Sequence, residues 1–180
     1  MLRYLISALL ASAPLAAASA EETGPGRWAL AAMPNGCMVQ AVSPAGTMLS
    51  VWGFAGDDKL GFLLQNRAWT VEDGATTPLE VDFAGASSWP VDATARAHID
   101  RDGPGLFFTV EPGGAGSFLA AFTSAEGMSI RRGGADVDTL PLEGSRVAIA
   151  SLAKCLAERW NAPAPEAEAK PDEPGAADAI

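Results

Sequence analysis

His98 is the only histidine of the chain, so it is the first side chain to consider as a general base or a metal ligand near neutral pH. It lies in an alternating run in which Arg96 and Asp100 fall on its own face. A hydrolase built on a Ser-His-Asp arrangement also needs a serine nucleophile, and the sequence has no Gly-x-Ser-x-Gly motif to supply one. The sequence therefore favours a surface histidine and assigns no catalytic residue, with a small hydrolase using His98 as an alternative.

A structural zinc site needs about four cysteine or histidine ligands at close spacing. Two distant cysteines and one histidine do not supply them. Two carboxylate pairs, Asp100 with Asp102 and Asp136 with Asp138, do not continue into a full calcium-binding loop. Aspartates are also common in hairpin turns without any metal. The sequence thus predicts no metal site and no cofactor.

The two cysteines, Cys37 and Cys155, are most simply explained as one disulfide, because an even pair in an oxidising compartment usually pairs. Such a bridge would join the start of the domain to its last helix. In the chain-entropy model, closing so long a loop stabilises the fold by up to about 5 kcal/mol. Two buried free thiols are the alternative.

Five tryptophans are spread along the chain, and such rings either fill a core or anchor a ligand or partner. Trp52 lies in a strand-like run on the face opposite to Leu49 and Val51. Trp69 and Trp89 lie next to turns, where partial exposure is expected. If the protein has a binding surface, the sequence places it at Trp69 and Trp89, and packing at the core or its edge is the alternative for both rings.

The first 20 residues have the pattern of a signal peptide. A single positive charge at Arg3 precedes an apolar run over residues 4–18, and Ala18-Ser19-Ala20 ends the segment with small residues. The run is shorter than the roughly 20 residues that a membrane span needs. We expect cleavage near Ala20, with an uncleaved N-terminal anchor as the alternative. No later stretch is long and apolar enough to span a membrane, so no integral membrane segment is expected after processing.

The chain of 180 residues has a formal net charge of −10, and its basic residues do not cluster. This balance argues against binding to nucleic acid or to anionic membranes, which requires groups of Lys and Arg. Residues 21–161 suit one globular domain. Residues 162–180 are rich in Ala, Pro and Glu and lack large apolar side chains until the last residue, so we expect a disordered acidic tail.

Turn signals recur every 8 to 12 residues and separate short strand-like runs, which predicts a mainly β fold. The expected strands are 37–42, 47–54, 60–64, 79–83, 94–100 and 106–110, with a hairpin of 128–132 and 136–142 around Gly133-Gly134. A short helix over 117–124 and a longer one over 145–160 break the pattern, with Ser117 and Ser145 as their N-caps. Together these elements predict a single β-barrel or β-sandwich-like domain of about eight to ten strands, closed by a C-terminal helix.

One part of the chain resembles a known family. The features that carry the resemblance are the helix Phe118-Leu119-Ala120-Ala121-Phe122, the strand pair 128–130 and 137–142, and the Gly144-Ser145 start of the last helix. The stretch 118–155 resembles the C-terminal part of small exported alphaproteobacterial proteins of the invasion-associated locus B type. The resemblance implies an exported β-rich domain with a terminal helix, and it implies no catalytic residue. That family typically has a further mid-chain cysteine pair, which this chain lacks.

These observations predict an exported, non-catalytic envelope protein, periplasmic or secreted, that binds another protein or envelope component. Besides the hydrolase using His98, a second alternative is a carrier of a small apolar ligand. A carrier would need a dry cavity inside the fold, lined by rings such as Phe62, Phe83 and Phe108.

Overall fold

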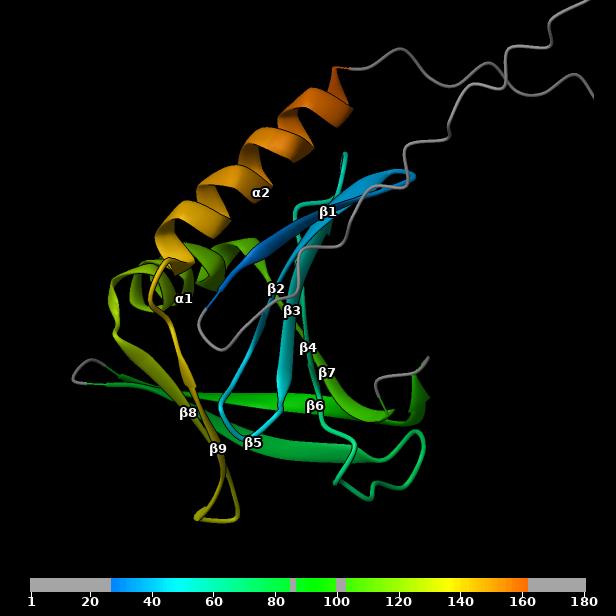
Figure 1. Ribbon diagram of the computed structural model, residues 1–180, viewed down its shortest axis with the longest axis vertical. Coiled ribbons are helices and arrows are strands. Elements are labelled where there is room, and N and C mark those ends of the chain that lie inside the picture. Colours follow the sequence, from blue (N-terminus) through cyan, green and yellow to red (C-terminus); the bar gives the residue numbers. More distant parts are fainter. Residues whose placement is uncertain (1–26, 85–86, 100–102, 162–180) are drawn as a thin grey trace, which may run out of the picture.

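The computed structural model describes residues 27–84, 87–99 and 103–161. The predicted signal peptide, 1–20, and the predicted tail, 162–180, lie outside these residues. Within them, nine strands form one antiparallel sheet with the order β1-β2-β3-β4-β7-β6-β5-β8-β9 (Figure 1). The strands are β1 (Ala29–Met33), β2 (Gly36–Val42), β3 (Met48–Phe54), β4 (Leu60–Gln65), β5 (Thr76–Phe83), β6 (Ser87–Ile99), β7 (Gly103–Val110), β8 (Gly127–Arg132) and β9 (Ala135–Pro141). The mainly β fold is therefore confirmed.

The sheet bends so that its two halves face each other. Strands β2 to β4 cross β5 and β6 at a steep angle, and the long strand β6 belongs to both halves because it pairs with β5 on one side and β7 on the other (Figure 1). The hydroxyl of Ser43, in the turn after β2, donates a hydrogen bond to Oδ2 of Asp138 on β9 at 2.8 Å. In the described part of the chain the edge strands β1 and β9 do not pair, so the sheet is sandwich-like and is not a closed barrel.

Two helices, α1 (Pro112–Ser124) and α2 (Ser145–Trp160), pack on the inner face of the bent sheet. Helix α2 lies along β1, β2 and β3, and its N-terminal part contacts α1. The disulfide between Cys37 on β2 and Cys155 on α2 is confirmed, with a Cα–Cα distance of 6.2 Å. The last helix is thereby joined covalently to the second strand.

Aromatic rings fill the centre of the domain. Phe62 on β4 is fully buried, and its ring centroid lies 5.1 Å from that of Phe108 on β7 and 5.2 Å from that of Phe118 on α1. Phe83 on β5 makes an edge contact with Phe118 at 5.1 Å. Phe118 therefore links the two halves of the sheet, because it contacts rings from both of them.

The helix starts differ from the sequence-based expectation. Helix α1 begins at Pro112, so Ser117 lies inside the helix and is not its N-cap. Helix α2 has Gly144 as its N-cap, with a left-handed φ of 81° that favours glycine, and Ser145 is its first residue. The buried hydroxyl of Ser145 donates a hydrogen bond to the carbonyl of Phe122 at 3.1 Å, which ties α2 to α1.

The strands also extend beyond the expected ranges. Strand β1 was not predicted at all. Strand β6 begins at Ser87, several residues before the predicted start at Thr94, and β7 begins at Gly103, before the predicted start at Leu106. The predicted hairpin around Gly133-Gly134 is confirmed, and both glycines have a positive φ.

Candidate binding surfaces

His98 lies near the end of β6, and its side chain is exposed. Within the described ranges it has no hydrogen bond or ion pair, and Asp100, its expected neighbour, lies outside them. Both cysteines form the disulfide, so neither is available as a nucleophile near it. In the same part of the chain, no three His, Cys, Asp or Glu side chains are placed to hold a metal ion. The described residues therefore do not form a hydrolase site around His98.

Trp69, one of the two predicted binding residues, is partly buried in the connection between β4 and β5. It lines a groove of about 260 Å³ together with Leu106 from β7 and Val137 from β9. Arg132 at the end of β8 also lines this groove and supplies its charged group. The groove thus lies where the two halves of the sheet approach each other, at residues far apart in the sequence.

Trp89, the second predicted binding residue, lies on β6 and is also partly buried. Its ring makes an edge contact with Phe118 at a centroid distance of 5.6 Å, so it packs against the core. The groove lined by Trp69 does not include Trp89 among its lining residues. Binding at either residue stays a prediction.

Phe62, Phe83 and Phe108, the rings expected to line a carrier cavity, are 0 to 3 % exposed and contact one another or Phe118. These rings fill the space that they were expected to line. They therefore give no support to the carrier alternative.

The outer face of β2, β3, β4 and β7 carries a second group of large apolar side chains. The strand registers place them on the side opposite to the buried core, since Met38 pairs with Trp52 and Leu63 pairs with Phe107. All are partly exposed, and none belongs to the core cluster or packs against it. We call this set the apolar outer face; it consists of Met38, Met48, Trp52, Leu63 and Phe107.

Trp52 lies in the middle of the apolar outer face. Its ring lies over Gly61 of β4, where an added Cβ would come within 2.4 Å of the indole. From there the ring reaches Phe107 on β7 and stacks with it at a centroid distance of 5.4 Å and an interplanar angle of 20°. The glycine therefore allows two aromatic rings from β3 and β7 to meet across β4.

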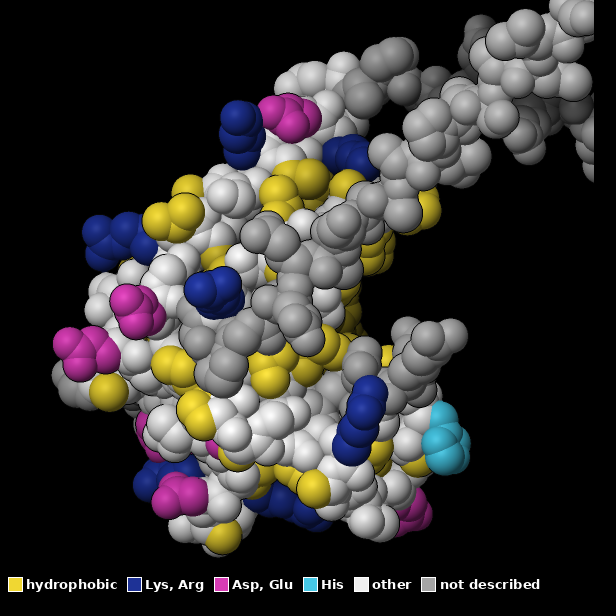
Figure 2. All heavy atoms as spheres, in the orientation of Figure 1, with side chains coloured by type: hydrophobic (Ala, Val, Ile, Leu, Met, Phe, Trp, Pro, Cys, Tyr) yellow, Lys and Arg dark blue, Asp and Glu magenta, His cyan; other side chains and the backbone are white. Residues whose placement is uncertain are grey.

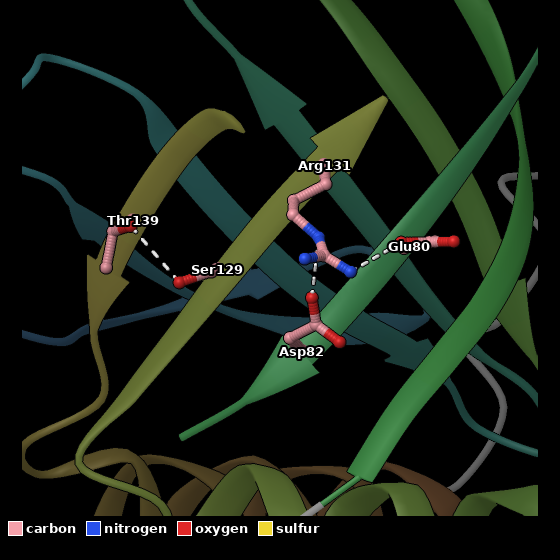
Figure 3. A network of polar contacts seen from close by, with 5 residues as sticks. All are labelled: Glu80, Asp82, Ser129, Arg131 and Thr139. Carbon is pink, nitrogen blue, oxygen red and sulfur yellow. Dashed lines mark hydrogen bonds and ion pairs between the residues drawn. The ribbon is translucent and has the colours of Figure 1, made fainter. Parts of the chain in front are cut away.

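The outer face of the other half of the sheet is polar. Arg131 on β8 donates a hydrogen bond to Oε2 of Glu80 at 2.7 Å, and its Nε forms an ion pair with Oδ2 of Asp82 at 2.9 Å (Figure 3). The hydrogen bond to Glu80 and the nearby charge of Asp82 raise the pKa of Arg131 above its ordinary value. The hydroxyls of Ser129 and Thr139 pair beside them at 3.2 Å. This half of the outer face is suited to water, whereas the apolar outer face is not.

Both helices lie on the inner side of the sheet, so no described element covers the apolar outer face. In the space-filling view the right-hand side of the molecule is hollowed, beside the position of β3 and β4 (Figure 2). Hydrophobic side chains lie along the wall of this hollow. Large contiguous apolar patches on a protein surface mark interaction sites.

Sequence reasoning did not identify this surface. The signal was the phase of Trp52, which alternation placed opposite to Leu49 and Val51, and that placement is confirmed by burial. The neighbouring strands are apolar on both faces, so the sequence pattern does not show which of the two faces is covered by other elements. Only the position of the helices shows which face the described elements leave uncovered.

No family model, curated protein or solved structure matches this chain. In the part of the chain that the structure describes, neither helix has the length and apolar character that crossing a membrane requires. The disulfide fits an extracytoplasmic location, where the compartment is oxidising.

Proposed function

We propose that this protein is exported through cleavage of residues 1–20 and acts without catalysis, by binding another protein of the cell envelope. The observation that carries the proposal is the apolar outer face, a surface with two stacked rings that no described element covers. The signal-peptide pattern and the disulfide support the compartment. The resemblance of residues 118–155 to exported proteins of the invasion-associated locus B type points in the same direction.

The chemistry of the surface favours a protein partner with exposed apolar side chains. Buried centres of protein interfaces are enriched in aromatic residues and methionine, and depleted in charge. Met38 and Met48 flank the paired rings of Trp52 and Phe107, and methionine side chains adapt readily to the shape of a partner. Trp52 is the expected anchor because tryptophan dominates binding energy at such centres.

The test compares two tryptophan variants of the exported, tagged protein. Trp52→Gln removes the anchor ring from the apolar outer face. Trp160→Gln is the matched control, because Trp160 is 65 % exposed and ends α2, which packs on the inner side of the sheet. Each protein is mildly cross-linked in envelope extracts, and captured proteins are quantified by mass spectrometry.

We expect a partner that the unmodified protein and Trp160→Gln capture equally and that Trp52→Gln captures at least tenfold less. Equal capture by all three proteins would exclude the apolar outer face as the binding surface. Trp69→Ala and Trp89→Ala in the same experiment test the surface predicted from the sequence. If no protein is enriched over a tag-only control, the binding function itself is wrong.

A further inference from the structure

The two edges of the sheet differ in their protection against pairing with another strand. Strand β9 carries Asp136 and Asp138, ends at Pro141, and pairs with β8 through a register shift between Ile130 and Arg131. Charges, proline and bulges are the features by which natural edge strands avoid pairing with other chains. The β9 edge is therefore protected.

Strand β1 has none of these features. Its sequence, Ala-Leu-Ala-Ala-Met, contains no charge and no proline. Its register with β2 is regular from the pair Ala29 and Gln40 to the pair Met33 and Gly36. In the described part of the chain, β1 pairs only with β2, so the other side of the strand is an open edge.

The register shows which residues present their backbone at this edge. A two-residue turn joins β1 to β2, so Met33 and Gly36 form the hydrogen-bonded pair that closes the hairpin. Hydrogen-bonded and non-hydrogen-bonded pairs alternate along an antiparallel ladder. Leu30 and Ala32 therefore point their N–H and C=O groups at the open edge. Their side chains lie on the inner face, because they pair with the buried residues Val39 and Cys37.

An apolar groove runs beside this edge, between β1 and α2. It has a volume of about 260 Å³, and Trp28, Leu30 and Val147 are among its lining residues. Leu30 is 50 % exposed and Val147 on α2 is 70 % exposed, although both are large and apolar. The open edge and the exposed apolar side chains thus occupy the same place on the molecule.

We propose that β1 is a dimerisation strand, which pairs antiparallel with β1 of a second copy of this chain across a two-fold axis. Such pairing joins the two sheets into one and brings the free N–H and C=O groups of Leu30 and Ala32 opposite the same groups of the second copy. Because β1 is uncharged, no like charges face each other across the axis. Such a pair is isologous, because each copy presents the same edge and the same groove to the other, and it closes at two copies without leaving β1 open.

The helices must contribute to this dimer as well. A strand of five residues alone buries less than the roughly 800 Å² per partner of a standard stable interface. In the paired sheet the inner faces of the two copies are continuous, so α2 of one copy lies next to α2 of the other. Leu30 and Val147 of both copies then fill the space between the helices, which accounts for their exposure in the single chain.

The test measures the oligomeric state of the exported, purified protein by sedimentation velocity over a concentration series. We expect a monomer–dimer equilibrium with a dissociation constant below about 100 µM. Ala32→Lys places a charge on the inner face of the edge strand, where the second copy would pair, and Val147→Glu places one in the groove. Glutamate suits the first turn of a helix, so Val147→Glu leaves the monomer folded. We expect each variant to raise the dissociation constant at least tenfold.

Ala135→Lys is the matched control, because Ala135 is an exposed alanine on β9 at the opposite edge. It should leave the dissociation constant within twofold of the original value. A protein that stays monomeric throughout the series overturns the proposal. The proposal is also overturned if Ala32→Lys leaves the dissociation constant of the dimer unchanged, or if Ala135→Lys raises it as much as Ala32→Lys does.

Amide hydrogen exchange gives a second measurement that needs no variant. We expect the protection of the Leu30 and Ala32 amides to rise with protein concentration, as dimers form. Strong protection that is independent of concentration would show that another segment of the same chain, or a co-purified strand, already pairs with β1. Either finding would overturn the proposal.

Discussion

Ser145 shows how a single hydroxyl connects two helices in this fold. It is 1 % exposed and donates its hydrogen bond to the carbonyl of Phe122. Phe122 lies in the last turn of α1, where carbonyl groups have no partner within the helix. The side chain of one helix therefore satisfies the end of another, and Ser145 does not cap its own helix.

This arrangement gives Ser145 a signature that a capping residue would not have. Aspartate is as good an N-cap as serine, but it cannot donate a hydrogen bond when ionised. We expect both Ser145→Ala and Ser145→Asp to lower the free energy of unfolding by about 1–3 kcal/mol, because the buried carbonyl of Phe122 loses its donor. Urea denaturation measures the change. A Ser145→Asp protein as stable as the original would show that the residue acts as an N-cap after all.

At the scale of elements, the sequence pattern predicts where most of the strands lie but not all of their first and last residues. Strand β5 was recognised from the alternation of Leu79, Val81 and Phe83, and these residues are buried. Strand β1 escaped notice because alanine, leucine and methionine favour helices and do not alternate with polar residues. The apolar outer face is uncovered by described elements because both helices occupy the other side of the sheet, and this is a tertiary property. It cannot be inferred from the local pattern of any one strand.

The start of α1 was misplaced for a related reason. Residues 112–116 are Pro-Gly-Gly-Ala-Gly, and glycine disfavours a helix by about 1 kcal/mol relative to alanine. The structure nevertheless extends the helix through them, from Pro112 at its first turn. Proline is well tolerated at that position because its missing N–H is not needed there.

Gly116→Ala distinguishes the two possible helix starts by the sign of its effect. In the structure Gly116 lies inside α1, and an added Cβ meets no atom within 4 Å. We therefore expect the substitution to raise the free energy of unfolding by about 0.5–1 kcal/mol. If the helix began at Ser117 or later, alanine would bring no such gain. Thermal unfolding, followed by circular dichroism, measures the change.

At the scale of the whole molecule, the first and last elements of the described chain are joined to each other. Helix α2, the last described element, lies on β1 and β2, the first two, and the disulfide joins residues 118 positions apart. Nearly all of the described chain therefore lies between the two bridged cysteines. In the chain-entropy model a bridge across so long a loop stabilises the fold by about 5 kcal/mol, against about 3 kcal/mol for a 15-residue loop.

Replacing both cysteines with alanine should lower the free energy of unfolding by about 2–5 kcal/mol. Denaturant unfolding of the oxidised protein and of the Cys37→Ala, Cys155→Ala double variant gives the difference. Adding a reducing agent should bring the original protein close to the double variant and leave the variant unchanged. Equal stability of the two oxidised proteins would contradict the stabilising role of the bridge.

The same bridge has a consequence for damage by proteases. Every peptide bond between Cys37 and Cys155 lies within a covalent ring. A single cut in any loop of that ring opens it without releasing a fragment, because the two pieces remain joined through sulfur. The strands on either side of the cut stay at the high local concentration at which they can pair again. Loss of a piece of the domain requires either a second cut or reduction of the bridge.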